Sequence, residues 1–421
     1  MAEHVDVLVV GAGPGGSATA YYLALAGVNV LVLEKGIFPR DKICGDGLTP
    51  RAVAELIRMG IQIEEDAGWV KNYGVRAYGA GHSISVPWPK LASMPNYGSA
   101  SPRAQFDHML AEKARAAGAE IREGVTVRSP ITDERTGRII GVEARNKAKE
   151  ELTVYAKFVV DAGGVAARIA TAAGREKMMD RPMGVAVRTY YESPLAATDM
   201  MESWLELWSG KPGESEQLPG YAWAFPVGNG LVNVGLGGIS PNGTATGIDY
   251  KNVFAKWVEN TPPEWQLTPE NERGTLRGAA LPMAFNRQPL YENGLALVGD
   301  AGGMISPFNG EGIAYALAAG RIVAQYLSQA LVRETTAEQD RVMGEYVRDM
   351  KAELGGYYTL GRIFALLISQ PAIMHICVKY GLPRPRLMRL VMKLLSDSYD
   401  RRGGDWMDKL ISVMTKVVPS S

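Results

Sequence analysis

The first segments of the chain alternate between apolar runs and glycine-rich turns. Residues 5–10 read VDVLVV, the pattern of a buried strand, and GAGPGG follows directly. The next residues, SATAYYLALAG, are rich in helix formers, and a second apolar run, VNVLVLE, ends at Glu34. Strand, glycine loop, helix and second strand in this order predict a dinucleotide-binding α/β unit.

Three glycines and one acid of this unit have separate expected roles. Gly11 permits the tight turn, Gly13 lets the backbone approach a pyrophosphate, and Gly16 allows the helix to pack closely on the strand. The helix N-terminus then faces the phosphates. Glu34 follows about 20 residues on, where its carboxylate can accept from a ribose hydroxyl. The alternative is a plain helix-packing turn.

Four segments in the middle of the chain predict consecutive strands of an antiparallel sheet. Turn residues separate MGVAVRTYYES, ESWLELWS, GYAWAFPVGNG and LVNVGLGGI. In the third segment Tyr221, Trp223 and Phe225 stand at every second position, so one strand face carries all three rings. The spacing favours a sheet core, although the size of the rings does not separate a core from a pocket.

The C-terminal part of the chain reads as helices, and residues 386–395, RLMRLVMKLL, are strongly amphipathic. Apolar residues share one face of this segment, while Arg386, Arg389 and Lys393 lie along another. Residues 371–402 contain seven Lys or Arg against two Asp. Such a helix can lie on an anionic membrane surface, and it can equally pack on the body of the protein with a solvated basic edge.

Composition narrows the classes of function. The 421 residues contain 45 Lys or Arg and 45 Asp or Glu, so no overall charge favours nucleic acid, and attraction to a membrane must come from a local patch. Cys44 and Cys377 are too few for a disulfide framework, which fits a reducing compartment. The first apolar run starts too early for a secretory signal, and no run approaches the roughly 18 apolar residues of a spanning helix. No nucleic-acid partner and no metal site are predicted.

A second glycine-rich segment, residues 293–320, bears on whether the expected dinucleotide is NAD or FAD. It reads NGLALVGDAGGMISPFNGEGIAYALAAG, again a strand that runs into glycines. The segment resembles the distal flavin motif of glutathione-reductase-type and hydroxylase-type flavoproteins, which implies FAD, with Asp300 holding the ribityl chain. Gly310 and Gly312 open an apolar helix whose positive end can face the flavin. The alternative is a glycine-rich turn before a core helix.

Two weaker signals lie between these motifs. SPRAQFDHMLAEKARAAGAEI resembles a flavoprotein helix whose leading Arg, here Arg103, reaches the cofactor; a surface Arg near a helix start is the alternative. FVVDAGGVAARIA, with Asp161 and Arg168, resembles the DG motif, but alanines stand where a serine is common, so a cofactor contact by Asp161 stays open. The sequence contains no second strand-glycine-helix unit for a nicotinamide, so NAD(P)H would bind without a domain of its own.

Together, the segments GAGPGGSATA, FPRDKICGDGLTP, YAWAFP and GDAGGMISPFNGEGI resemble the geranylgeranyl reductase family of FAD-dependent flavoproteins, and within it the actinobacterial-type menaquinone reductases. The resemblance covers nearly the whole chain. It implies saturation of carbon–carbon double bonds of polyprenyl chains on reduced FAD. It also implies that Cys44 lies beside the flavin and that Tyr221, Trp223 and Phe225 line a prenyl tunnel.

The implied reaction gives Cys44 a chemical role. A trisubstituted alkene is not polarised, so its saturation requires a hydride on one carbon and a proton on the other, held close together. Cys44 can donate or relay that proton, or position the alkene; a thiol is a modest acid, with a reference pKa of about 8.5. The alternative is a small loop residue packed on the flavin.

These observations predict an α/β protein with a Rossmann-like FAD-binding domain of the hydroxylase type, an inserted antiparallel β-sheet substrate domain and a helical C-terminal region. The FAD-binding domain is expected at 1–72, 100–178 and 273–335, the substrate domain at 73–99 and 179–272, and the helical region at 336–421. The candidate catalytic residue is Cys44, and the candidate substrate-binding residues are Tyr221, Trp223 and Phe225. The candidate cofactor-binding residues are Gly11, Gly13, Gly16, Glu34, Lys35, Cys44, Gly45, Gly47, Arg103, Val127, Asp300, Gly310, Gly312 and Ile313.

The expected function is reduction of an isoprene unit of the menaquinone tail, by a cytoplasmic protein bound peripherally to the inner face of the cell membrane. Three alternatives stay open: reduction of geranylgeranyl chains of lipids or diphosphates, a flavin monooxygenase or hydroxylase, and a non-catalytic quinone-linked electron-transfer flavoprotein. The halogenase signature WxWxIP is absent from the sequence. The electron donor is open among NAD(P)H, ferredoxin and another reductase.

Overall fold

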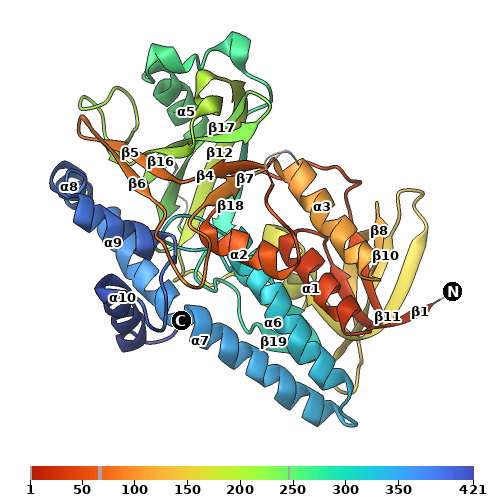
Figure 1. Ribbon diagram of the computed structural model, residues 1–421. Helices are drawn as coiled ribbons and strands as arrows, with labels where there is room; N and C mark the ends of the chain where they lie inside the picture. Colours follow the sequence, from red (N-terminus) through yellow and green to blue (C-terminus); the bar gives the residue numbers. More distant parts are fainter. Residues whose placement is uncertain (1, 65–68, 245–246) are drawn as a thin grey trace.

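The computed structural model describes residues 2–64, 69–244 and 247–421, which form two large sheets with helices around them (Figure 1). The first sheet has eight strands in the order β19-β20-β11-β1-β2-β8, extended by β10 on β11 and by β9 on β10. Its strands are β1 (Glu3–Val10), β2 (Val30–Glu34), β8 (Glu120–Glu123), β9 (Thr126–Thr132), β10 (Ile139–Arg145), β11 (Glu151–Asp161), β19 (Tyr291–Glu292) and β20 (Leu295–Leu297).

Alternation along the central strands decides which elements cover this sheet. β1 and β2 pair in parallel and are joined by α1 (Pro14–Leu25), as the sequence predicts. Val7 and Val9 point to the face covered by α1, α3 (Arg103–Ala116) and α6 (Ile313–Leu331). Leu8 points to the opposite face, which the β9–β10 hairpin and α4 (Arg168–Ala172) cover. Both faces are buried, so the strands are apolar at nearly every position.

The second sheet has seven strands in the order β18-β12-β17-β16-β13-β5-β6. Its predicted antiparallel character is correct except between β13 and β5, which pair in parallel because the chain leaves for the flavin domain between them. Helix α5 (Tyr250–Glu259) covers one face of the sheet. The strands are β5 (Gly74–Gly79), β6 (His82–Pro87), β12 (Met183–Glu192), β13 (Met200–Trp204), β16 (Gly220–Gly228), β17 (Leu231–Ser240) and β18 (Arg277–Pro282).

One predicted domain boundary lies too early. The expected FAD-binding segment begins at residue 273, but β18 pairs with β12 along its whole length and therefore belongs to the second sheet. Smaller elements lie outside the two large sheets. They are β3 (Gly47–Leu48), α2 (Pro50–Arg58), β4 (Val70–Asn72), β7 (Gly98–Ala100), β14 (Leu207–Trp208) and β15 (Gln217–Leu218).

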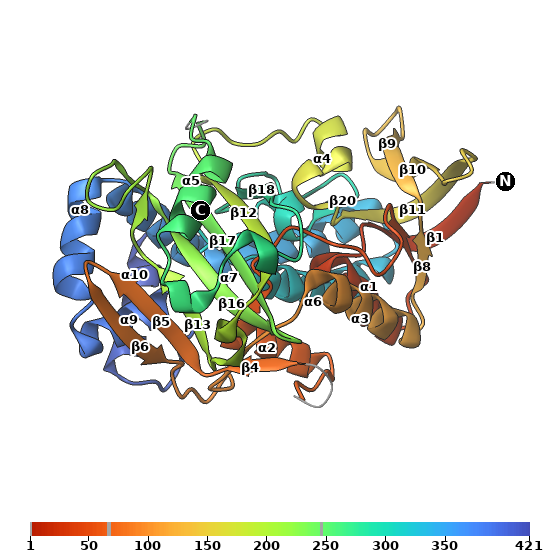
Figure 2. The ribbon, with the colours of Figure 1, turned by 90° about the horizontal axis from the view of Figure 1, so that it is seen from above.

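The C-terminal region is helical, as predicted. Its last helices, α8 (Pro371–Ile376), α9 (Pro385–Leu395) and α10 (Trp406–Val417), lie at the end of the molecule away from the β9–β10 hairpin (Figure 2), whereas Asp340 near the start of its first helix contacts Arg138 between β9 and β10. Its long helix starts with a capping box between Thr335 and Glu338. In the described residues no single helix is long and apolar enough to cross a membrane, although α7 and the segment after it pass that test together with a 95° bend. The helices are α7 (Thr336–Ile368), α8 (Pro371–Ile376), the π-helix η7 (Cys377–Gly381), α9 (Pro385–Leu395) and α10 (Trp406–Val417).

Lys393 was expected on the exposed basic face of α9 together with Arg386 and Arg389, and this expectation is wrong. Its side chain is buried, and its ammonium group donates to Asp405 at 2.8 Å and to Asp408 at 2.7 Å. These two acids form the N-terminal capping box of α10. Lys393 therefore joins α9 to α10, while Arg386 and Arg389 stay exposed.

Candidate active site

A cavity of about 760 Å³ runs between the two large sheets. It extends from the turn between β1 and α1, along one face of β16, to the inner sides of α7, α8 and α9. The predicted cofactor- and substrate-binding residues come together here, with the exception of Gly16. Those that line the cavity are Gly11, Gly13, Glu34, Lys35, Cys44, Gly45, Gly47, Arg103, Val127, Tyr221, Trp223, Phe225, Asp300, Gly310, Gly312 and Ile313.

The geometry of the β1–α1 turn accounts for Gly11, Gly13 and Gly16. Gly11 has a φ of 95°, and a Cβ there would lie 2.7 Å from the carbonyl oxygen of Ala162. Gly13 precedes the first turn of α1 and has no side chain to cap it, so the first N–H groups of the helix face the cavity. A Cβ on Gly16 would lie 1.9 Å from the Gly11 carbonyl oxygen. Gly16 therefore serves helix-on-strand packing rather than lining the cavity.

Glu34 ends β2 and is buried at the cavity wall. Its carboxylate accepts from the backbone N–H groups of Ala12 and Gly36, each at 2.8 Å. The guanidinium of Arg40 donates to both of its oxygens, at 3.0 and 3.1 Å. A ribose hydroxyl would therefore share this carboxylate with Arg40.

Arg40 is one member of a chain of buried ion pairs that was not predicted from the sequence. Its other nitrogen donates to Asp107 at 2.8 Å. Asp107 also accepts two hydrogen bonds from Arg103, at 2.6 and 2.8 Å. Arg103 was predicted as a cofactor contact, and it lies against the thiol of Cys44 as well. The acidic residue one turn after Arg103 was the available sequence signal.

The second glycine-rich segment forms the other end of the cofactor part of the cavity. Asp300 lies on the wall, with its carboxylate 3.8 Å from the ammonium of Lys42. Gly312 precedes α6, and a Cβ on it would lie 3.4 Å from Asp300 Oδ1. The N-terminus of α6 thus opens toward the cavity next to an acid.

In the alanine-rich DG-like segment, residues 158–170, the acid Asp161 does not face the cofactor part of the cavity. Asp161 is completely buried and does not line the cavity; it accepts from the backbone N–H groups of Gly163 and Ala170, at 2.9 and 3.0 Å. Burial raises the pKa of Asp161, partly offset by these N–H groups. Asp161 therefore orders the backbone, while residues 162–166 and Arg168 of the same segment line the cavity.

These residues fit FAD. A glycine turn that leaves helix N–H groups free suits a pyrophosphate, and the buried acid ending the second strand suits a ribose. A second helix N-terminus, that of α6, and Asp300 stand on the same cavity and suit the flavin end. Two such ends on one continuous cavity match a dinucleotide rather than a mononucleotide.

Cys44 lies half-buried on the cavity wall, in the loop after β2. Removal from water raises the pKa of its thiol, and the positive charge of Arg103 offsets this only in part. The group is therefore a neutral thiol at neutral pH, with a guanidinium beside it. A neutral thiol can give a proton, and the neighbouring cation would stabilise the thiolate that is left.

Two strands of the second sheet fix the Cys44 loop in place. The amide of Asn233 donates to the carbonyl of Cys44 at 2.9 Å and to Asp46 at 2.8 Å, and its oxygen accepts from Trp223 at 2.9 Å. The Tyr190 hydroxyl also donates to Asp46. Burial raises the pKa of Asp46 to about 6, against the opposing effect of these donors. Asn233 is wholly buried, and its only signal in the sequence was a polar residue within an apolar strand.

The three rings of β16 face the cavity. Tyr221 and Trp223 have ring centroids 5.8 Å apart, and Trp223 and Phe225 are 6.1 Å apart. The intervening Ala222 and Ala224 point to the other side, into the core under α5. Of the two interpretations of this spacing, core and pocket, the geometry therefore favours the pocket.

Glu311 is another acid on the cavity wall, and it was not predicted from the sequence. Thr49 donates to its Oε1 at 2.6 Å, while its buried Oε2 has no hydrogen-bond partner in the described part of the chain. Burial raises the pKa of Glu311 to about 7, despite Thr49 and the charge of Arg51. Glu311 stands between Gly310 and Gly312, in the segment whose resemblance implied FAD. From that segment, Asp300, Gly310, Gly312 and Ile313 were predicted as site residues, and Glu311 was not.

The fold and the site define a flavoprotein with a Rossmann-like FAD-binding domain of the hydroxylase type. A family model described as "FAD binding domain" matches residues 4–341. The chain is 32% identical over 415 residues to a menaquinone reductase of Mycolicibacterium smegmatis, covering 97% of this chain and 96% of that protein. It is 30% identical over 358 residues to a digeranylgeranylglycerophospholipid reductase of Thermoplasma volcanium, covering 83% and 84%.

A solved structure gives the same answer for the fold. A geranylgeranyl bacteriochlorophyll reductase-like protein of Thermoplasma acidophilum superposes with a TM-score of 0.77 at 24% identity, over 98% of this chain and 100% of that one. The chain therefore belongs to the geranylgeranyl reductase family of FAD-dependent oxidoreductases. FAD is its cofactor, as the resemblance of the second glycine-rich segment to a flavin motif implied.

Proposed function

We propose that this enzyme is a prenyl reductase that saturates a carbon–carbon double bond in the polyprenyl tail of menaquinone. The relatives named as menaquinone and digeranylgeranylglycerophospholipid reductases support a prenyl substrate, and the higher coverage and identity of the former favour menaquinone. The observation that carries the proposal is the single cavity that joins the flavin-binding residues to an aromatic and apolar channel.

The composition of this channel suits an isoprenoid chain. Beyond the rings of β16, the wall continues through Phe364 and Ile368 of α7, Met374 of α8, and Met388 and Met392 of α9. Each buried CH₂ contributes about 0.8 kcal/mol, so several isoprene units provide enough binding energy to hold a neutral tail. Methionine side chains adapt to irregular apolar shapes, which suits a flexible chain.

Saturation of an isoprene unit requires a hydride at one alkene carbon and a proton at the other. Reduced FAD supplies the hydride when it is bound. The proton must come from an acid on the wall, and that acid must regain a proton from solvent after each turnover. Cys44 and Glu311 both stand on this wall, and charges on either of them would raise the pKa of Tyr221, which places Tyr221 near both.

We assign the proton at the alkene to the Cys44 thiol, because its neutral form is favoured and Arg103 can stabilise the thiolate formed. We assign to Glu311 the supply of protons to this part of the cavity. Its pKa of about 7 lets it exchange protons with solvent near neutral pH, and its Oε2 is free to form a further hydrogen bond.

The proposed function is tested by incubating the reduced holoenzyme with menaquinone in detergent and analysing the lipid by mass spectrometry. We expect a gain of two hydrogens per turnover. A gain of oxygen would indicate a hydroxylase, and unchanged lipid with oxidised flavin would indicate electron transfer alone. Faster reduction of geranylgeranyl diphosphate or of a geranylgeranyl ether lipid would overturn the choice of menaquinone. Running the assay with NADPH, ferredoxin or dithionite identifies the electron donor.

Cys44→Ala should lower prenyl reduction by roughly 10²- to 10⁴-fold, the usual range for loss of a general acid. FAD content and the rate of flavin reduction should stay near those of the parent, because the backbone contacts of Cys44 with Asn233 remain. Cys377→Ala, at an exposed cysteine, is the matched control. Parental prenyl reduction by Cys44→Ala would return this residue to a packing role.

The raised pKa of Glu311 leads us to expect that prenyl reduction depends on pH. Its raised pKa of about 7 means that it is protonated below and charged above this pH, so prenyl reduction should fall as the pH rises through about 7. In Glu311→Gln the rate should be lower and this fall should disappear. A fall that persists unchanged in Glu311→Gln would assign the titration to another group. The pH dependence of flavin reduction, measured in parallel, separates proton supply from cofactor binding.

We also propose that the enzyme works while bound peripherally to a membrane, since a polyprenyl tail is strongly retained by a bilayer. The support comes from the C-terminal helices, which line the cavity with their inner sides. Ten of the seventeen exposed large apolar side chains in the described residues belong to this region. They are Ile363, Leu366, Leu367, Ile376, Tyr380, Leu387, Trp406, Leu410, Val413 and Val417.

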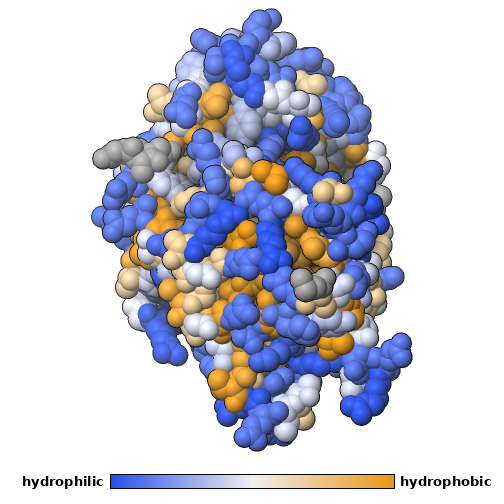
Figure 3. Space-filling view, turned by 90° about the vertical axis from the view of Figure 1, so that its right-hand side faces the viewer, coloured by the Kyte–Doolittle hydropathy of each residue, from blue (hydrophilic) through white to orange (hydrophobic). Residues whose placement is uncertain are grey.

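The distribution of charge also supports the C-terminal helices as the surface that contacts the membrane. Residues 363–395 contain no Asp or Glu, while Lys379, Arg384, Arg386 and Arg389 are exposed. At the other end of the molecule, hydrophilic side chains interrupt the apolar ones across the face (Figure 3). Part of the apolar face of α9, expected to contact lipid, lines the cavity instead, through Val391 and Leu395. The contact with lipid is therefore assigned to Leu387 and the exposed basic residues of α9, together with the outer sides of the neighbouring helices.

Binding to anionic liposomes should therefore weaken with salt and with charge reversal. Arg386→Glu combined with Arg389→Glu should lower binding at least about 30-fold, since each basic residue near an anionic surface contributes about 1 kcal/mol. Activity in detergent should be kept. Arg128→Glu combined with Arg135→Glu, exposed at the opposite end, is the control. Equal sedimentation of both double variants with liposomes would show that this surface does not dock.

A further inference from the structure

A second cavity, of about 360 Å³, lies on the reverse side of the seven-stranded sheet. Side chains alternate along β5 and β13, so Ala77 and Ser203 line the active-site cavity while Tyr78 and Trp204 line the second one. The sheet itself separates the two cavities. The second cavity is therefore not an extension of the prenyl channel.

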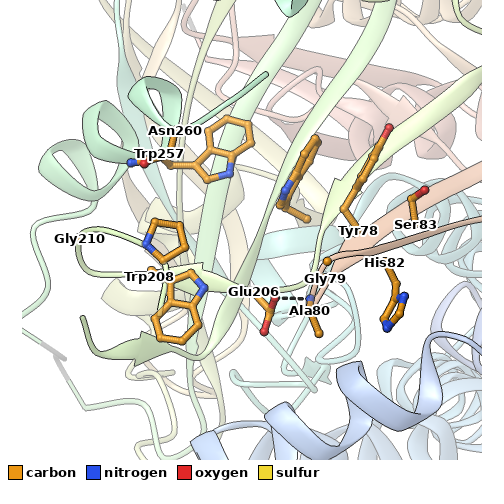
Figure 4. A pocket seen from close by; sticks show the side chains of 13 residues that line it. Tyr78, Gly79, Ala80, His82, Ser83, Glu206, Trp208, Gly210, Trp257 and Asn260 are labelled. Atoms are coloured by element: carbon orange, nitrogen blue, oxygen red, sulfur yellow. Dashed lines mark hydrogen bonds between the residues drawn. The ribbon is translucent and has the colours of Figure 1, made fainter. Parts of the chain in front are cut away.

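Four aromatic side chains form the walls of this second cavity. The rings of Tyr78 and Trp204 stack at 4.0 Å with an angle of 12°, and Trp257 stands nearly perpendicular to Trp204, at 75° and 5.9 Å. Trp208 comes from β14 and lies, with Trp257, across the cavity from Tyr78 (Figure 4). Pro212 and Asn260 complete this side.

A single carboxylate stands between these aromatic walls. Glu206 lies at the centre of the cavity, and one of its oxygens accepts from the backbone N–H of Ala80 (Figure 4). No Lys or Arg belongs to the described lining, and His82 is exposed at the edge. The ammonium of the nearby Lys256 is turned to the carbonyl of Ser209, at 3.1 Å. The cavity thus combines aromatic faces with one uncompensated negative charge.

We propose that this cavity binds an organic cation that carries a quaternary ammonium group. The negative faces of aromatic rings attract a cation, and Glu206 adds a full opposite charge. A quaternary group has no N–H that would lose hydrogen bonds on leaving water, so it suits a cage whose acceptors are mainly ring faces. The volume lies at the small end of ligand sites, which fits a headgroup-sized molecule.

Calorimetric titration of the holoenzyme with choline tests the proposal. We expect saturable binding, and at least about tenfold weaker binding of 3,3-dimethylbutanol, the neutral isostere, because it lacks the cation–π attraction; tenfold corresponds to about 1.4 kcal/mol. Glu206→Gln keeps the shape and the acceptor for Ala80 but removes the charge, and should weaken choline binding about tenfold or more. Glu214→Gln, at a highly exposed acid paired with Lys211, should leave binding unchanged.

Trp208→Leu should weaken choline binding as well, since it removes one ring while keeping an apolar side chain. Prenyl reduction should stay at the parental rate in Glu206→Gln, because this cavity lies behind the sheet. Cosedimentation with phosphatidylcholine vesicles that depends on Glu206, without binding of free choline, would assign the quaternary ammonium to a lipid headgroup. Equal affinity for choline and its neutral isostere, or no binding of either free or vesicle-borne choline groups, would overturn the proposal.

Discussion

The chain of buried charges from Glu34 through Arg40 and Asp107 to Arg103 is the constraint on which the active site depends. It connects the end of β2, the loop after it and the start of α3. A buried ion pair adds little net stability, but loss of one partner leaves an uncompensated charge and costs several kcal/mol. The four groups therefore fix one another's positions. Because Arg103 lies against Cys44, the position of the thiol is connected through this chain to Glu34, where the cofactor's ribose is expected.

The Cys44 loop is held from the other side by the second sheet. Asn233 contacts the backbone of Cys44, Asp46 and the ring nitrogen of Trp223, so the loop and the aromatic strand are connected through one amide. Hydrogen bonds through Asn233 thus hold the flavin-binding loop and the aromatic strand of the channel in fixed positions relative to each other. A hydride and a proton must reach adjacent carbons in one geometry, and a connection of this kind restricts the motion that would misalign them.

The parts of this architecture that could be predicted from sequence are those coded by local spacing. The alternation of Tyr221, Trp223 and Phe225 and the helical C-terminal region follow from periods of two or 3.6 residues. The first glycine-rich turn follows from its place between a strand pattern and a helix pattern, and the second was recognised by its resemblance to a flavin motif. Contacts between distant segments have no such code. Asn233 reaches a loop almost 190 residues away. Lys393 was misplaced because amphipathic spacing on α9 contains no information about the two acids that begin α10.

Burial links the acids of the site to the proposed substrate. Asp46, with a pKa of about 6, and Glu311, with a pKa of about 7, both keep protons longer than exposed carboxyls, because an apolar cavity disfavours their charged forms. The same lack of water raises the pKa of the Cys44 thiol. An unactivated alkene offers no charge for an acid to recognise, so an enzyme that reduces it depends on shape and exclusion of water. The apolar wall that would hold a prenyl chain is then also what keeps protons on the groups that deliver them.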